Sequence, residues 1–286
     1  MIQDIGPSVF SNHYAPRQPR TDSFVLFFEG DALPVRRDPE KRTLLFPRWR
    51  EFAVPPRPTY AFSIDGRDYF LALDGAETPQ GYELLPIRTL RGLPLASNAY
   101  LFTVYSAYHL WRWYAGSRYC GCCGAAMEQD RAERAMFCPA CRTKVYPRIN
   151  PAVIVGVING DRLLLTKYRT GFAHNALVAG FAEFGETLEE TVAREVMEEV
   201  GLRVKNIRYY KSQPWGIAAD LLAGFFCQVE GDPSIRMDQS ELKYAEWVRR
   251  EDVALQPADY SLTNEMMKLF RDGKEKDFFE RLPVPC

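Results

Sequence analysis

The sequence has almost no net charge, and it lacks any long apolar run. Its 36 lysines and arginines stand against 37 acidic residues, which leaves a formal charge of −1 with histidine neutral. This balance argues against a protein that holds nucleic acid by bulk electrostatics, but it leaves room for a small basic groove. No apolar run approaches the roughly 20 residues that a membrane-spanning helix needs, so we expect no membrane association.

Glycine and proline are too few, at 19 and 20 of 286 residues, for a disordered or collagen-like chain. The segment from Met1 to Pro7 has no basic stretch ahead of an apolar core, so the sequence predicts no secretory signal. The sequence has seven cysteines, and an odd number argues against a disulfide framework because they cannot all pair. We therefore expect a cytoplasmic globular protein, and its length favours about two domains.

Five of the cysteines are concentrated in one short segment. They include two C-x-x-C pairs, Cys120 with Cys123 and Cys138 with Cys141. Each pair forms a tight turn that directs two thiolates at one ion, and two such turns complete a closed tetrahedral zinc site. A redox-active pair is the alternative, but the βαβ context it needs is missing. Four thiolates leave no open coordination position, so we expect structural Zn²⁺.

The zinc segment divides the chain into three predicted domains. Residues 1–117 carry short β-like runs separated by turn signals such as Asp65-Gly66, and they end in a long helix over residues 98–116 with Ser97 as the candidate N-cap. Residues 118–147 form the zinc ribbon. Residues 148–286 alternate strands with helices, so the whole chain is predicted to be α+β.

An acidic helix is the decisive feature of the third domain. We expect a helix over residues 186–200 that stops at Gly201. Glu195 and Glu199 then lie one turn apart, with Glu198 beside them. Like charges at this spacing repel, and a divalent cation such as Mg²⁺ removes that cost because it prefers carboxylate oxygens. The alternative is an ordinary solvent-exposed charged face.

The same segment resembles the Nudix box at every defined position. The motif requires Gly, five residues, Glu, seven residues, Arg-Glu-aliphatic, one residue, Glu-Glu, one residue and Gly-aliphatic. Here these positions are Gly180, Glu186, Arg194, Glu195, Val196, Glu198, Glu199, Gly201 and Leu202. The resemblance implies hydrolysis of a nucleoside diphosphate linked to another group, with Mg²⁺ or Mn²⁺. It also implies an α/β/α sandwich with a mixed sheet.

Two further features resemble the NADH pyrophosphatase branch of that family. The four-cysteine ribbon is one, and Ser212-Gln213-Pro214-Trp215 is the other, because it matches the opening of the branch signature. The branch then continues Pro-Phe-Pro-x-Ser, whereas this chain continues Gly216-Ile217-Ala218-Ala219-Asp220. Without the prolines we expect a softer substrate wall, and Asp220 adds a negative charge. Trp215 has the alternative interpretation of a core aromatic.

The resemblance implies roles for individual residues. The metal ligands for Mg²⁺ or Mn²⁺ are the carbonyl of Ala179 and the side chains of Glu195, Glu198, Glu199 and Glu241. Glu198 is also the candidate for orienting or deprotonating water. Arg194 pairs with Glu186 and positions Glu195, unless it is only a structural salt bridge. The residues expected to line the substrate site are Glu133, Tyr146, Phe181, Gln213, Pro214, Trp215, Gly216, Ile217, Ala218, Ala219 and Asp220.

Three functions stay open at this point. The first is hydrolysis of NAD(H) to nicotinamide mononucleotide and AMP, with removal of NAD caps from RNA 5′ ends, by a homodimer as the branch implies. The second is hydrolysis of another dinucleotide or a nucleotide sugar, because the Pro-Phe-Pro-x-Ser part is missing. The third is a nucleotide- or RNA-binding protein without catalysis, against which the intact acidic set argues.

Overall fold

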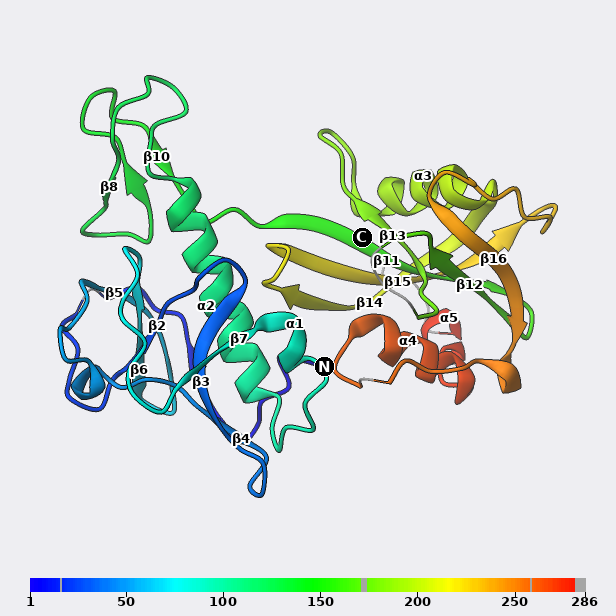
Figure 1. The fold of residues 1–286 in the computed structure, drawn as a ribbon. Helices are drawn as coiled ribbons and strands as arrows, with labels where there is room; N and C mark the ends of the chain where they lie inside the picture. The colour runs from blue at the N-terminus through cyan, green and yellow to red at the C-terminus, as the bar shows by residue number, and fades with distance from the viewer. Residues whose placement is uncertain (16, 171–173, 258, 281–286) are drawn as a thin grey trace. The chain divides into compact units, whose positions relative to one another are not determined.

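The computed structural model describes residues 1–15, 17–170, 174–257 and 259–280. The chain divides into two compact units (Figure 1). Residues 2–148, with residues 216–219, form the first, which we call the N-terminal unit. Met1 with residues 149–215 and 220–286 forms the second, the C-terminal unit. In the part of the chain that the structure describes, no helix is both long and apolar enough for a membrane crossing.

The N-terminal unit starts with small antiparallel and mixed sheets. One has the strand order β1-β5-β6-β2, and the other has the order β4-β3-β7. Their bounds are Phe10–Ser11 (β1), Phe24–Leu26 (β2), Ala32–Asp38 (β3), Thr43–Leu45 (β4), Pro58–Ile64 (β5), Arg67–Ala72 (β6) and Glu83–Pro86 (β7). The core includes the fully buried rings of Phe27 and Phe70. The predicted β-rich character of this region and the hairpin turn at Asp65-Gly66 are confirmed.

Helical segments and the ribbon complete the N-terminal unit. The short helices are Trp49–Glu51 (η1) and Ile87–Leu90 (α1), and the long helix is Ala99–Gly116 (α2). The predicted long helix is therefore confirmed, but its N-cap residue is Asn98, not Ser97. The Ser97 hydroxyl still accepts a hydrogen bond from the amide of Ala99, at 3.1 Å. The ribbon is a three-stranded antiparallel sheet of Glu128–Gln129 (β8), Met136–Phe137 (β9) and Lys144–Val145 (β10).

A six-stranded mixed sheet forms the centre of the C-terminal unit. Its order is β14-β15-β11-β12-β16, with β13 paired to β11, and only β11 and β15 run parallel. The strands are Asn150–Asn159 (β11), Arg162–Tyr168 (β12), Val178–Phe181 (β13), Arg203–Trp215 (β14), Asp220–Glu230 (β15) and Leu242–Arg249 (β16). The helices are Leu188–Val200 (α3), Arg250–Asp252 (η2), Leu262–Arg271 (α4) and Lys276–Glu280 (α5).

Alternation along β11 explains why helices cover both faces of this sheet. Val153 and Val155 pack with Val192 and Val196 of α3, whereas Ile154 packs with Met266 and Phe270 of α4. Successive side chains of a strand point to opposite faces, so a continuous apolar strand supplies two cores. The predicted α/β/α sandwich with a mixed sheet is confirmed.

The start of α3 differs from the sequence-based expectation. The helix begins at Leu188, and Thr187 is its N-cap, so Glu186 lies before the helix rather than in its first turn. The Thr187 hydroxyl accepts a hydrogen bond from the Glu190 amide, and the Glu190 carboxylate accepts one from the Thr187 amide. This reciprocal capping box fixes the start of the helix. Gly201 ends it with a φ of 67°, as predicted.

Candidate active site and zinc site

Glu199 is the most deeply buried acid on the acidic face of α3. Its side chain is 1 % exposed, and one carboxylate oxygen, Oε2, has no hydrogen-bond partner among the described residues. The other, Oε1, accepts a hydrogen bond from the Tyr168 hydroxyl at 3.0 Å. Burial raises the pKa of Glu199 to about 8, and the negative charge of Glu241 adds to the rise. A buried carboxylate with a free oxygen is a group that a cation would stabilise.

Glu195 lies one turn earlier and against strand β13. A Cβ atom built on Gly180 would lie 1.9 Å from the Cδ atom of Glu195, so only glycine leaves room for this carboxylate. Burial raises the pKa of Glu195, although hydrogen bonding to Arg194 opposes the rise. The backbone of Ala179 also contributes a hydrogen bond that lowers the pKa of Glu199. Glu195 and Glu199 therefore both lie against neighbouring residues of β13 and do not diverge.

Arg194 joins three acids through one guanidinium group. Its Nε donates to Glu186 Oε1 at 2.6 Å, and its Nη2 donates to Glu186 Oε2 at 2.9 Å. Its Nη1 donates to Glu195 at 2.7 Å and to Glu198 at 3.0 Å. The predicted pair with Glu186 thus forms, and it lowers the pKa of Glu186 to about 2. A fifth contact, from Nη2 to the carbonyl of Phe181 at 2.9 Å, ties α3 to β13.

The remaining acids lie at the edge of this cluster. Glu198 is 60 % exposed, which leaves its carboxylate open to water. Glu241 is exposed in the turn before β16, and its charge raises the pKa values of both Glu195 and Glu199. Carboxylate and carbonyl oxygens are the ligands that Mg²⁺ and Mn²⁺ prefer. The acids of this face fit a divalent cation, because Glu199 Oε2 is buried without a partner in the described residues.

The four cysteines of the ribbon form one cluster, as predicted. Their sulfur atoms all lie within 4.8 Å of one another, and the Cys120–Cys141 and Cys123–Cys138 sulfur pairs are 3.5 Å apart. Tetrahedral Zn²⁺ with Zn–S bonds of about 2.3 Å needs sulfur separations of roughly 3.8 Å, so the geometry fits. In both turns the amide four residues on, of Gly124 or Arg142, donates to the carbonyl of the first cysteine. Cys122 is exposed and lies outside the cluster.

Two residues expected to line the substrate site are buried. The carboxamide of Gln213 donates to the Tyr260 carbonyl and accepts from the Leu262 amide, both at 2.8 Å, so it anchors the start of α4. Asp220, which the sequence analysis expects to add a negative charge to the substrate wall, is also buried. Trp215 is half-buried, and its ring stacks on Tyr260 with centroids 6.4 Å apart.

The other expected substrate residues are accessible to differing degrees. Phe181 is 53 % exposed beside the acid cluster, and Pro214 is exposed on β14. The carboxylate of Glu133 accepts hydrogen bonds from Tyr146 at 2.7 Å and Lys144 at 2.6 Å, which lower its pKa. The turn between β14 and β15 belongs to the N-terminal unit, and its residues are Gly216, Ile217, Ala218 and Ala219. A Cβ atom on Gly216 would lie 2.2 Å from the backbone oxygen of Tyr105, so this turn lies close to α2.

Sequence reasoning missed Tyr168. Its hydroxyl donates to Glu199 and accepts from the Ala179 amide at 3.2 Å, so it links two positions expected to bind metal. Strand alternation was the available signal, because Leu164 and Tyr168 share the face of β12 that packs with α3. A register shift between Lys167 and Tyr168 hides the final position of the ring from such a pattern.

Comparison with known proteins agrees with this geometry. Residues 148–270 match the NUDIX domain model. Residues 116–146 match the NADH pyrophosphatase zinc ribbon domain model. The chain carries a Nudix domain. The predicted Nudix domain and the predicted zinc ribbon are therefore confirmed for these two segments, and the acid cluster on α3 lies within the first of them.

Curated relatives carry the name NAD-capped RNA hydrolase NudC. The protein of Klebsiella pneumoniae is 44 % identical over 147 residues, which is 50 % of this chain and 56 % of the relative. The protein of Shigella flexneri is 45 % identical over 148 residues, with the same coverage of 50 % and 56 %. The chain thus spans about half the length of these relatives. A NUDIX hydrolase structure from Nitrosomonas europaea covers 56 % of this chain and 93 % of its own, with 20 % identity and a TM-score of 0.49.

Replacing Cys138 by serine is expected to remove the zinc ion and unfold the ribbon. A structural zinc site supplies folding free energy, so the substitution lowers the melting temperature as well as the zinc content. Elemental analysis and calorimetry measure the two quantities. Cys122→Ser is the matched control and should retain both, because Cys122 lies outside the sulfur cluster. A Cys138→Ser protein with full zinc and unchanged melting contradicts the assignment.

Burial of Glu199 predicts a pH dependence of stability without added divalent cation. The folded pKa is raised from 4.5 to about 8, so the folded protein binds the proton more tightly than the unfolded chain. Its contribution to stability is complete below about pH 4.5 and is lost as the pH rises through about 8. Denaturant unfolding across this range should show a loss of a few kcal/mol in wild type that Glu199→Gln removes. Equal slopes in the two proteins exclude the buried acid as the cause.

Removing the Tyr168 hydroxyl is expected to weaken metal binding. Tyr168→Phe leaves the ring in place but deletes the donor to Glu199, and loss of such an outer partner typically costs about 10-fold or more in metal affinity. Titration of Mn²⁺ in the absence of substrate measures the effect. Tyr209→Phe, at an exposed ring of β14, is the control. Equal Mn²⁺ affinities in the two variants would show that the Tyr168 hydroxyl has no such role.

Proposed function

We propose that the protein hydrolyses the pyrophosphate bond of NAD(H) to nicotinamide mononucleotide and AMP, and that it removes NAD caps from RNA. The observation that carries this proposal is the acid cluster of α3, which lies in a Nudix domain that follows an NADH pyrophosphatase zinc ribbon. The name of the curated relatives, NAD-capped RNA hydrolase, supports the same substrates.

The same proposal includes the domain boundaries, the oligomeric state and the localisation. Residues 1–117 form the β-rich domain, residues 118–147 the zinc ribbon and residues 148–286 the hydrolase domain. The protein acts as a cytoplasmic homodimer, as the branch implies. The matched ranges of the two family models, 116–146 and 148–270, support the positions of the ribbon and of the hydrolase domain.

In the proposed mechanism, the acid cluster holds Mg²⁺ or Mn²⁺. The ligands are Glu195, Glu199 and Glu241, together with the carbonyl of Ala179. Bound divalent cations neutralise pyrophosphate oxygens and lower the pKa of a water molecule. The protein's part is to keep these oxygens close together, and the contacts of Tyr168 and Gly180 with Glu199 and Glu195 do this.

Proton transfer and charge balance fall to two further residues. Glu198 orients or deprotonates the attacking water, because its carboxylate is open to solvent while one oxygen is held by Arg194 at 3.0 Å. Arg194 keeps Glu195 and Glu198 in place and, through Glu186, anchors them to the loop before α3. The exposed ring of Phe181 offers a flat surface for a base or the nicotinamide.

A second candidate is hydrolysis of another dinucleotide or a nucleotide sugar. The motivating observation is the segment Gly216 to Asp220, which replaces Pro-Phe-Pro-x-Ser and ends in a buried acid. This difference changes the substrate wall and leaves the acid cluster intact.

The test is product analysis with NADH and Mn²⁺. We expect release of AMP and nicotinamide mononucleotide, and a loss of about 10²–10⁴-fold in kcat for Glu198→Gln because general-base catalysis is removed. Glu189→Gln is the control, since Glu189 is an exposed residue on the same helix. Turnover of ADP-ribose or diadenosine polyphosphate in place of NADH selects the second candidate. Binding of nucleotides without turnover of any of them overturns the proposed function.

A further inference from the structure

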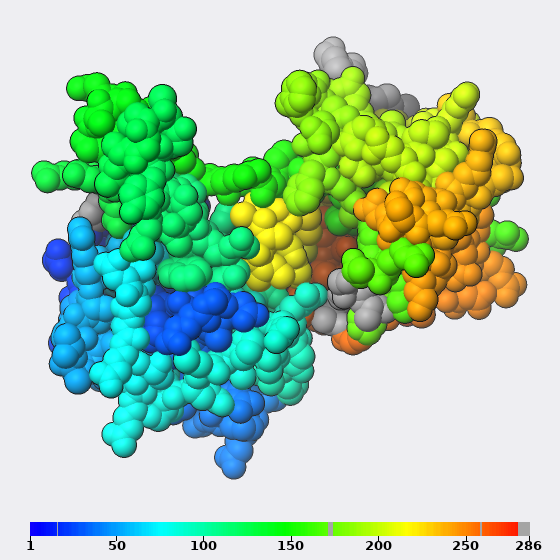
Figure 2. All heavy atoms as spheres, turned by 45° about the horizontal axis from the view of Figure 1, so that its top comes forward, coloured from blue at the N-terminus to red at the C-terminus, as the bar shows by residue number. Residues whose placement is uncertain are grey.

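The N-terminal unit contains a cleft of about 770 Å³ that the acid cluster does not use. Figure 2 shows the ribbon in green and the preceding residues of the same unit in blue and cyan. The walls of the cleft come from β5, from the end of α2 and from the ribbon residues around β8. Its volume is within the range of about 300–1,000 Å³ that is typical of ligand sites.

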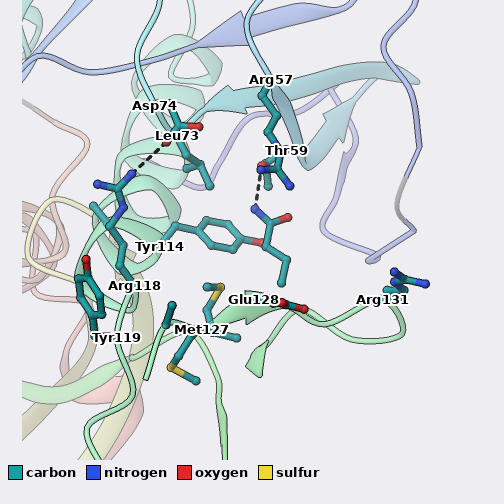
Figure 3. A pocket seen from close by; sticks show the side chains of 14 residues that line it. Arg57, Thr59, Leu73, Asp74, Tyr114, Arg118, Tyr119, Met127, Glu128 and Arg131 are labelled. Atoms are coloured by element: carbon teal, nitrogen blue, oxygen red, sulfur yellow. Dashed lines mark hydrogen bonds and ion pairs between the residues drawn. The ribbon is translucent and has the colours of Figure 1, made fainter. Parts of the chain in front are cut away.

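One hydrogen bond joins two walls of this cleft. The Gln129 side chain of the ribbon donates to the Thr59 hydroxyl of β5 at 3.0 Å (Figure 3). Met127, Met136 and Tyr114 are buried along the cleft and give it an apolar floor. The cleft is therefore formed before any ligand arrives, which lowers the entropic cost of binding.

The charged groups of the cleft favour an anion. Three arginines line it against two acids, Asp74 and Glu128. Arg118 is paired with Asp74 at 2.9 Å. Within the described residues, the guanidinium groups of Arg57 and Arg131 have no ion pair or hydrogen bond. A free guanidinium presents a planar fork of donors that matches phosphate oxygens.

Aromatic rings also line the cleft. Tyr119, directly after Arg118, is 71 % exposed at the rim. In Figure 3 the ring of Tyr114 lies between Arg57 on one side and Arg118 on the other. A single-stranded nucleic acid offers phosphates to the guanidinium groups and flat bases to an exposed ring such as that of Tyr119. An acidic peptide would use only the charges and would leave the exposed ring of Tyr119 without a partner.

A second, smaller hollow of about 280 Å³ extends the surface beyond the Gln129–Thr59 bond. It shares Thr59 and Gln129 with the first cleft and adds Tyr14, Arg17 and Tyr60. The Arg17 guanidinium lies over the Tyr60 ring at 4.6 Å from its centroid. Two adjoining hollows that both combine arginine with tyrosine side chains suit an extended chain better than one small molecule.

We propose that this cleft binds single-stranded RNA, with Arg57 and Arg131 on phosphates and Tyr119 stacked on a base. The inference rests on the proposed function only in naming RNA as the body of the capped substrate. The N-terminal unit then has a task separate from hydrolysis. This unit retains the RNA chain, whereas the acids of α3 act on the cap.

The test measures binding of a labelled, uncapped RNA of about twelve nucleotides to the full-length protein by fluorescence anisotropy over a range of salt concentrations. Arg57→Ala/Arg131→Ala should bind roughly tenfold more weakly and should reduce the slope of log K against log salt by about 1.4, which is about 0.7 for each lost phosphate contact. Arg67→Ala/Arg88→Ala removes two exposed arginines outside the cleft and is the control.

Variants of Tyr119 test the stacking separately. Tyr119→Ala should weaken RNA binding by roughly fivefold or more, whereas Tyr119→Phe keeps the ring and should bind like wild type. Zinc content and melting temperature establish that each variant is folded. All these variants should hydrolyse NADH at the wild-type rate, because NADH has no RNA chain to hold.

Three outcomes would overturn the proposal. They are the absence of wild-type binding up to about 100 µM RNA, equal losses in the cleft and control double variants, and competition by polyglutamate as effective as that by unlabelled RNA. The last outcome would identify the cleft as a site for acidic peptides. A failure of the proposed function is seen separately, as a wild-type protein that binds RNA through the cleft and yields no products from NADH.

Discussion

The acid cluster depends on Arg194. Four of its five nitrogen–oxygen contacts, at 2.6–3.0 Å, go to the carboxylates of Glu186, Glu195 and Glu198. Three carboxylates gathered around one point repel one another. One guanidinium fork cancels part of that repulsion and fixes the directions of the side chains. The fifth contact, to the Phe181 carbonyl, fastens the acidic face to β13.

Arg194 does not reach Glu199, and this difference divides the cluster into two environments. Glu186 is ionised at low pH because of its contacts with arginine, whereas burial shifts the pKa of Glu199 upward to about 8. An acid buried in this way opposes folding at neutral pH when no cation is present. Tyr168 offsets only part of that cost, with one hydrogen bond. A bound divalent ion would offset the rest of the free-energy cost of burying the Glu199 carboxylate. The same burial that destabilises the fold therefore strengthens metal binding.

The sequence predicted motifs better than it predicted accessibility. The cysteine pairs, the α3 stripe of Val192, Val196 and Val200, and the glycine at the helix end each follow from local spacing, so they could be read without a structure. The first turn of α3 was misplaced because Thr187 and Glu190 form a capping box that competes with the acid at position 186. Strand β3 is hard to predict from the sequence because Ala32–Asp38 contains a proline and three charged residues, which hide the period of two.

The sequence says least about residues whose surroundings are decided by tertiary contacts. Gln213 belongs to a family signature, but its carboxamide is used twice in holding α4, and no pattern in β14 reveals this. Tyr168 belongs to no motif, and the register shift beside it obscures the strand alternation that would otherwise place its ring. Both residues take their meaning from segments distant in sequence, and that information is absent from a local window.

The buried Gln213 also changes the expectation of a softer substrate wall. Loss of the prolines after Trp215 removes backbone stiffness from residues 216–220. However, the preceding strand is held by two side-chain hydrogen bonds to the start of α4, and Trp215 stacks on Tyr260. The buried Asp220 lies at the start of β15, paired in register with Trp215. The turn is therefore anchored on both sides by contacts that do not need proline. The difference from the family signature lies in the shape and polarity of the wall, so it bears on which dinucleotide fits, while the acids of α3 are unaffected.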